Sequence, residues 1–276
     1  MAAAPSLGSP LTSFCRLVVY GGFTVALIPL QFLAVGLKLS LRKKLPHWYH
    51  RKCCRILGFE IETRGTVTER RPRLFVCNHV SYLDITILGA CIRGSFIAKS
   101  DVAGWPFFGV LAKLQETVFV IRDPRRVADQ TEEIRVRIAA GDDLILFPEG
   151  TSGDGNYVLP FKSALFSVAE KAAPETGLVV QPVTIAYTRL DGLPMGRYLR
   201  PFFAWYGDME LAQHLWRAVG MGRLTVAVQF HAPVDPVDFA SRKALSDHCQ
   251  ATISKGLAAA LAGGGDIGAV NEGTGS

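Results

Sequence analysis

An uncharged, mostly apolar run from Leu17 to Leu37 constrains the fold of this chain more than any other feature of its sequence. About 20 apolar residues in a helix suffice to cross the hydrocarbon core of a bilayer. The run is too long for a secretory signal peptide, and no small-residue cleavage site follows it. Because Pro29 and Gly36 interrupt it, a bent or interfacial segment fits as well as a span, and a buried core helix is the soluble alternative. The run therefore predicts a membrane-associated helix.

Basic residues gather beside this run. The net charge is +6, and four cations follow the run closely: Lys38, Arg42, Lys43 and Lys44. By the positive-inside rule they place the downstream domain in the cytoplasm. An aromatic and basic stretch at residues 47–52 suits the headgroup zone or an ordinary helix surface. Anionic lipid accounts for this positive charge, so no nucleic-acid partner is predicted.

Composition and cysteine usage agree with a cytoplasmic membrane protein. Hydrophobic residues make up 49% of the chain and charged residues 20%, which indicates that part of the chain contacts a membrane. The six cysteines include no CxxC pair and no Cys/His spacing typical of zinc, so no metal site is predicted. Cys53 and Cys54 are adjacent and poorly placed to bridge each other. Free thiols in a reducing cytosol follow.

From about residue 57, short β-rich runs alternate with helical stretches. This alternation predicts an α/β domain with a largely parallel sheet flanked by helices. We expect a membrane anchor with a basic and aromatic interfacial segment (1–56), the α/β domain (57–262) and a Gly-rich, disordered tail (263–276). The expected strands are Glu60–Thr63, Leu74–Cys77, Ser95–Ala98, Thr117–Ile121, Leu144–Phe147, Leu178–Ile185 and Leu224–Phe230. The expected helices are Leu83–Cys91, Pro106–Leu114, Val127–Ala140, Ser163–Ala172 and Pro236 to about Leu261.

A histidine and an aspartate follow the second expected strand. His79 and Asp84 lie just beyond Leu74–Cys77, where an α/β sheet commonly presents reactive groups. Histidine is the usual side chain for taking a proton from a hydroxyl near neutral pH. A nearby carboxylate can fix its tautomer and stabilise the imidazolium. By itself the pair also fits an ordinary structural contact.

A glycine-rich turn follows the strand expected at Leu144–Phe147. Its sequence, from Phe147 to Gly155, permits close backbone approach, and its Thr, Ser and main-chain N–H groups can bind an oxyanion. The turn also fits a plain connection between strand and helix. It lacks the last glycine of a nucleophile elbow and the Gly-Lys-Ser/Thr ending of a P-loop.

Together these segments resemble the glycerolipid acyltransferase family, whose best-known member is 1-acylglycerol-3-phosphate acyltransferase. Four blocks match in the family's order over roughly residues 57–230, and ordered blocks are more specific than any single motif. The first two blocks are Asn78-His79-x4-Asp84 and Gly104–Gly109 with Val118–Arg122. The last two are Phe147–Thr151 with Pro160–Lys162, and Val180–Val183 ahead of Ile185.

The resemblance implies a role for each matching residue. His79 would be the general base that deprotonates the acceptor hydroxyl as it attacks an acyl thioester, and Asp84 would orient and stabilise it. No cofactor is implied, because acyl-CoA or acyl carrier protein brings the activated carbonyl as a co-substrate. Substrate-binding elements are implied at Arg122, Glu149, Gly150, Thr151 and Ser152, with Asn78 and Lys162 as supporting residues.

One position departs from the family's pattern. Members with a phosphate acceptor typically carry Arg directly after Glu-Gly-Thr, and here that position is Ser152. Serine cannot offer the bidentate fork of arginine to a phosphate. The variant turn, with Trp205–Met209 and His214–Trp216 downstream, looks more like the lyso-ornithine lipid acyltransferases, whose acceptor has an amino-acid headgroup. Asp154 or Asp208 would suit such a headgroup, while Arg122 and backbone N–H groups would suit a phosphate.

The sequence thus predicts a lysolipid O-acyltransferase of phospholipid and membrane-lipid biosynthesis. It is expected at a bacterial inner membrane, with its catalytic domain on the cytoplasmic side. The acceptor is 1-acylglycerol-3-phosphate or lyso-ornithine lipid. The alternatives are a non-catalytic lipid-binding or membrane-remodelling protein on the same fold, and a hydrolase that would use Ser81 as its nucleophile.

Overall fold

A mixed sheet forms the centre of the computed structural model, which describes residues 8–120 and 127–263. Its eight strands take the order β1-β8-β6-β2-β5-β3-β4, and β7 pairs with β6. Neighbours are parallel except where β6 meets β8 and β7, so the prediction of a largely parallel α/β sheet is confirmed. The strands are β1 Phe59–Arg64, β2 Arg73–Cys77, β3 Ser95–Lys99, β4 Val118–Val120, β5 Leu144–Leu146, β6 Val179–Leu190, β7 Leu193–Pro194 and β8 Leu224–Phe230.

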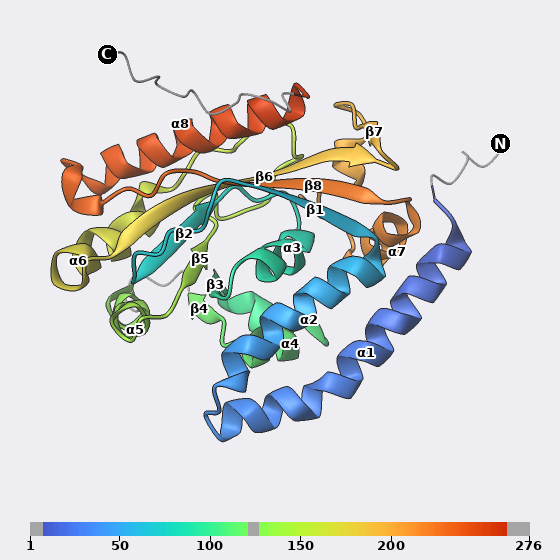
Figure 1. Cartoon of the computed structure of the whole chain (residues 1–276), viewed down its shortest axis with the longest axis horizontal. Coiled ribbons are helices and arrows are strands. Elements are labelled where there is room, and N and C mark those ends of the chain that lie inside the picture. The colour runs from blue at the N-terminus through green and yellow to red at the C-terminus, as the bar shows by residue number, and fades with distance from the viewer. Residues whose placement is uncertain (1–7, 121–126, 264–276) are drawn as a thin grey trace, which may run out of the picture.

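Helices cover both faces of the sheet (Figure 1). On one face Phe75 and Cys77 of β2 pack into the same core as α2, α3 and α7. On the other face Leu74 and Val76 pack with α5, α6 and α8. Successive residues of β2 therefore alternate between two cores, which explains its unbroken apolar sequence. The α-helices are α1 Pro10–Gly36, α2 Leu41–Leu57, α3 Leu83–Cys91, α4 Phe108–Leu114, α5 Val127–Ala139, α6 Ser167–Thr176, α7 Leu211–Gly220 and α8 Arg242–Leu261.

Several elements differ from the sequence prediction. The region expected as Ser163–Ala172 begins with a short 3₁₀ turn, Ser163–Phe166, before α6, and another, Pro236–Asp238, precedes α8. Strand β6 continues to Leu190 because it pairs with β8 over most of that length. The pattern also missed α2 and α7. Charged residues and Pro46 hide the apolar face of α2, which becomes visible only when it packs on α3.

Helix α1 packs along the domain and still exposes much of its apolar surface. It contacts α7, α2 and α4, and Arg16 donates to the carbonyl oxygens of Val219, Met221 and Gly222 at 2.8–3.1 Å. The helix is long and apolar enough to cross a membrane. Large apolar side chains remain exposed at Leu11, Phe14, Val18, Val19, Val25, Leu30, Phe32 and Leu33.

The structure describes two of the three regions expected from the sequence and almost none of the third. The segment 1–56 contains α1 and almost all of α2, and both helices contact the elements after residue 57. The expected tail lies almost wholly outside the described residues, which end at 263. The anchor and the tail therefore stay predictions from the sequence.

Candidate active site

The loop that leaves β2 places His79 beside Asp84. Asp84 lies in the first turn of α3, and its Oδ2 accepts hydrogen bonds from the backbone N–H groups of Val80 and Ser81 at 2.7 and 3.0 Å. The same oxygen lies 2.8 Å from Nδ1 of His79. Because a carboxylate only accepts, Nδ1 carries the proton and Nε2 keeps a lone pair. Asp84 is fully buried, whereas the His79 side chain is 20% exposed. The dyad therefore leaves Nε2 of His79 as its basic nitrogen, on a side chain that lines a cavity.

Tyr187 completes the surroundings of Asp84 and was not predicted from the sequence. Its hydroxyl donates to Asp84 Oδ1 at 2.7 Å from the middle of β6. Burial keeps the pKa of this phenol well above its usual range, so it remains a donor. Asn78 ties the end of β2 to the same strand through two 2.9 Å hydrogen bonds with the backbone of Ile185. The neighbouring strand thus fixes both ends of the dyad.

The glycine-rich turn meets His79 from the other side of β2. Strands β2 and β5 are parallel neighbours, so their carboxyl ends share one edge of the sheet. The Phe147 ring stacks on the His79 ring with centroids 4.1 Å apart. Glu149 is buried, and its Oε1 accepts from the His79 backbone N–H at 2.8 Å while Oε2 accepts from the Leu159 N–H at 3.1 Å. Glu149 thus holds the backbone of His79 in place.

The remaining predicted site residues are largely brought together. Gly150, Thr151, Ser152 and Lys162 all line one cavity with His79. Gly150 has φ +65°, and a Cβ added there would lie 2.7 Å from Lys162 Nζ, so glycine suits this turn. Ser152 Oγ donates to the backbone oxygen of Trp205. Arg122 lies outside the described residues.

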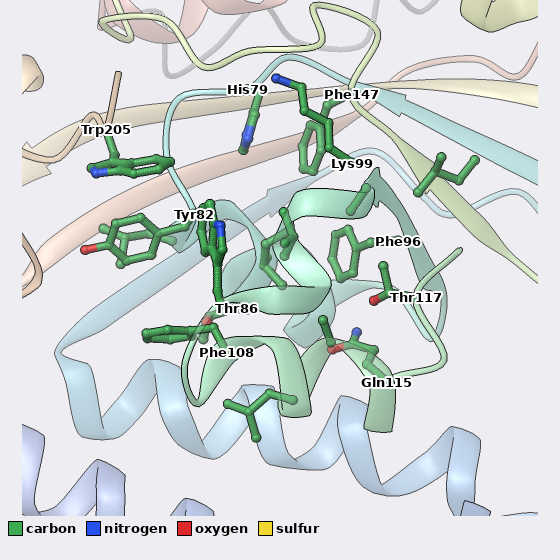
Figure 2. Close-up of a pocket in the computed structure, with 18 of the residues that line it drawn as sticks. His79, Tyr82, Thr86, Phe96, Lys99, Phe108, Gln115, Thr117, Phe147 and Trp205 are labelled. Carbon is green, nitrogen blue, oxygen red and sulfur yellow. The ribbon is translucent and has the colours of Figure 1, made fainter. Parts of the chain in front are cut away.

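The cavity extends from His79 into the space between the sheet and the N-terminal helices. Its volume is about 650 Å³. Apolar and aromatic side chains dominate its walls, and Figure 2 shows Phe96 and Phe108 below His79 in that view. Tyr20, Leu27 and Ile28 of α1 and Leu45 of α2 form part of its lining. Lys99, at the end of β3, lines the same cavity and was not singled out from the sequence.

This arrangement suits proton transfer at a hydroxyl in an apolar setting. A base must lie within hydrogen-bond reach of the proton it takes, and Nε2 of His79 is the group available. Ser81 is fully buried and its Oγ accepts from the Leu83 N–H at 3.4 Å, so it does not present a nucleophile. Within the described residues, no three His, Cys, Asp or Glu side chains are grouped as metal ligands.

Comparisons with known proteins agree with this chemistry. A family model described as Acyltransferase matches residues 58–186. A lyso-ornithine lipid O-acyltransferase from Brucella abortus (strain 2308) is 46% identical over 244 residues, which cover 87% of this chain and 91% of that protein. The chain belongs to the acyltransferase family.

More distant members of the family show the same relationship. A 1-acyl-sn-glycerol-3-phosphate acyltransferase from Neisseria gonorrhoeae is 34% identical to this acyltransferase, over 71% of this chain and 73% of that protein. The crystal structure of the 1-acyl-sn-glycerophosphate acyltransferase PlsC from Thermotoga maritima matches with a TM-score of 0.64 at 23% identity. That match covers 90% of this chain and 93% of the PlsC chain, and it supports the fold. The predictions of an enzyme, and of an acyltransferase that associates with the membrane, are confirmed.

Glu149 gives this acyltransferase a pH-dependent stability. Burial raises the pKa of its carboxyl to about 8, against the opposing hydrogen bonds from His79 and Leu159. In the unfolded chain the pKa is about 4.5. Between these values the folded state holds more protons, so stability falls as pH rises from about 4.5 to about 8.

Glu149→Gln should remove this decline, because an amide does not titrate. The variant should also have a free energy of unfolding about 1 kcal/mol lower at low pH. The reason is that the amide nitrogen of glutamine cannot accept a hydrogen bond from either the His79 or the Leu159 N–H group. Melting temperatures of the purified protein in detergent, measured from about pH 5 to about pH 8, test this. Equal slopes for the wild type and the variant would contradict it.

Proposed function

We propose that this acyltransferase transfers a fatty acyl group from acyl-CoA or acyl carrier protein to the hydroxyl of a lyso-ornithine lipid. The observation that carries the reaction is the His79–Asp84 dyad, which is joined at 2.8 Å and whose histidine lines an apolar cavity. His79 Nε2 accepts the hydroxyl proton while the oxygen attacks the thioester carbonyl. Asp84 stabilises the imidazolium that forms. The C–O bond forms, the C–S bond breaks, and the departing sulfur takes the proton from His79.

The cavity suits the acyl chain. Its volume of about 650 Å³ falls in the range of small-molecule sites, ~300–1,000 Å³. Each methylene moved from water into such a cavity contributes about 0.8 kcal/mol. The thioester would then lie near His79, where Lys99 and Lys162 also line the cavity and supply positive charge. No cofactor is required, because the thioester is already activated.

The N-terminal helices would hold the site at the membrane surface. Gln31 of α1 donates to the Leu114 carbonyl at 2.8 Å, and near the other end Ser13 donates to the Trp216 carbonyl at 2.8 Å. A helix fastened to the domain near both ends is better suited to lie within one leaflet than to cross the bilayer. The exposed apolar residues of α1 would contact acyl chains, and the cations after it would contact anionic headgroups on the cytoplasmic side.

The amino-acid headgroup is favoured by Ser152 and by the relative from Brucella abortus, which is named for a lyso-ornithine lipid. The serine leaves the turn without the arginine fork that suits a phosphate. It uses its hydroxyl to hold the backbone of Trp205. Asp154 is less suited to a headgroup than the sequence indicated, because both its oxygens accept hydrogen bonds from Asn156.

Ser152→Arg should shift acceptor preference toward 1-acylglycerol-3-phosphate. The guanidinium adds a bidentate partner for phosphate, worth ~1.5–3 kcal/mol when charge-assisted, or about tenfold or more in kcat/KM. The measurement is competition between both acceptors in one assay. Ser152→Ala is the matched control, since it loses the bond to Trp205 without adding charge. An unchanged acceptor ratio in the arginine variant would contradict this reading of the turn.

A further inference from the structure

Three aromatic side chains from distant parts of the sequence meet beside the dyad. The Trp205 ring lies 5.8 Å from the Tyr82 ring at 74°, and 5.4 Å from the Trp105 ring at 78° (centroid distances). All three residues are half-buried and line the cavity that contains His79. In Figure 2, Trp205 and Tyr82 lie on one side of His79, and Phe147 lies on the other. We name Tyr82, Trp105 and Trp205 the aromatic corner.

Hydrogen bonds hold the aromatic corner to the catalytic loop. The Trp205 backbone N–H donates to the Val80 carbonyl at 3.0 Å, and Ser152 donates to the Trp205 carbonyl. The indole N–H is already used, since it donates to the Met209 carbonyl at 2.9 Å. The Tyr82 hydroxyl shares a 2.8 Å hydrogen bond with His214 Nδ1. These bonds use the indole N–H of Trp205 and the hydroxyl of Tyr82, so what these residues offer to a ligand in the cavity is aromatic surface.

Ring faces attract cations, because the quadrupole of an aromatic ring is negative on its face. Asp101 is exposed and lines the same cavity, which adds negative charge to its wall. Lys162 lines the cavity at Gly150, so positive charge is also present there. A cavity lined by groups that attract cations and by a group that attracts anions matches a zwitterionic headgroup. A phosphate monoester offers no cation to the aromatic rings.

We infer that the aromatic corner binds the side-chain ammonium of an amino-acid headgroup, with Lys162 serving the headgroup carboxylate. This inference rests on the proposed function and names the residues that select its acceptor. It gives Ser152 a second role. The serine stands where an arginine would bind a phosphate, and it also positions Trp205 for the ammonium. Two residues further along the chain support the aromatic corner: the Met209 carbonyl accepts from the Trp205 indole, and His214 shares a hydrogen bond with the Tyr82 hydroxyl.

The test compares two acceptors that differ only in the cation. Lyso-ornithine lipid is assayed beside the same lipid built on norvaline, whose side chain has no ammonium. The purified full-length enzyme in detergent should show kcat/KM about tenfold higher for the ornithine lipid, the range expected for one partly desolvated cation on aromatic rings. Trp205→Leu and Trp105→Leu should each reduce this preference several-fold through KM. Trp205→Phe, which keeps a ring face, should retain most of it.

Trp216→Leu is the matched control. Trp216 is exposed on α7 and does not line the cavity, so this variant should keep the wild-type ratio. Partial misfolding lowers turnover of both acceptors alike, so the ratio still reports the aromatic corner. Equal use of both acceptors by the wild type would leave the proposed function standing and overturn the aromatic corner. An enzyme that acylates only the phosphate acceptor would overturn the proposed function itself.

Discussion

His79→Ala is expected to lower acyl transfer by about 1,000-fold while leaving the fold intact. A positioned general base contributes ~100- to 10,000-fold. Among the described residues, His79 supplies the one side-chain nitrogen that is hydrogen-bonded to Asp84. The His79 side chain packs on Phe147 and is partly exposed, so its removal costs little packing. Initial rates with a labelled acyl thioester and lysolipid in detergent provide the measurement.

His248→Ala is the matched control for this experiment. His248 lies exposed on α8, on the opposite face of the sheet from the dyad. Its loss should leave the rate unchanged, and both variants should melt near the wild-type temperature. Full activity in the His79 variant would remove the catalytic assignment.

Asp84→Asn is expected to lower the rate by at least about 100-fold, even though the site can keep its geometry. The asparagine oxygen can accept from His79, Val80 and Ser81, and its nitrogen can donate to the Tyr187 hydroxyl. What the variant lacks is the negative charge that stabilises the imidazolium.

Tyr187→Phe separates charge from positioning. It removes one charge-assisted hydrogen bond to Asp84, worth ~1.5–3 kcal/mol, but leaves the negative charge beside His79. Because this bond is present in both the ground state and the transition state, a loss in rate of about tenfold or less is expected. If Asp84→Asn and Tyr187→Phe reduced kcat equally, Asp84 would act through positioning alone, and the charge argument would be wrong.

The dyad could be identified from the sequence because it is local. His79 and Asp84 are five residues apart, and a strand followed by a helix brings them together without help from the rest of the fold. The turn at Glu149 was linked to the dyad through the family resemblance. The structure brings the two together because β2 and β5 are parallel neighbours whose carboxyl ends share one edge of the sheet. The alternation that predicted most strands is likewise a local property.

The contacts across long sequence separations could not be predicted. Tyr187 is 103 residues from Asp84, and only the register of β6 against β2 brings it there. The aromatic corner joins residues 82, 105 and 205 through the same kind of packing. Helix α2 was missed because its apolar face is discontinuous in the sequence and becomes visible only against α3.

The most direct test of the account follows thioester and lipid together. Purified enzyme in detergent is given a labelled acyl thioester with lyso-ornithine lipid, and both the acylated lipid and the released thiol are quantified. An enzyme that works through His79 forms the two products in equal amounts, only when the lysolipid is present, and His79→Ala loses both. Thiol released with free fatty acid and no acylated lipid would contradict this mechanism.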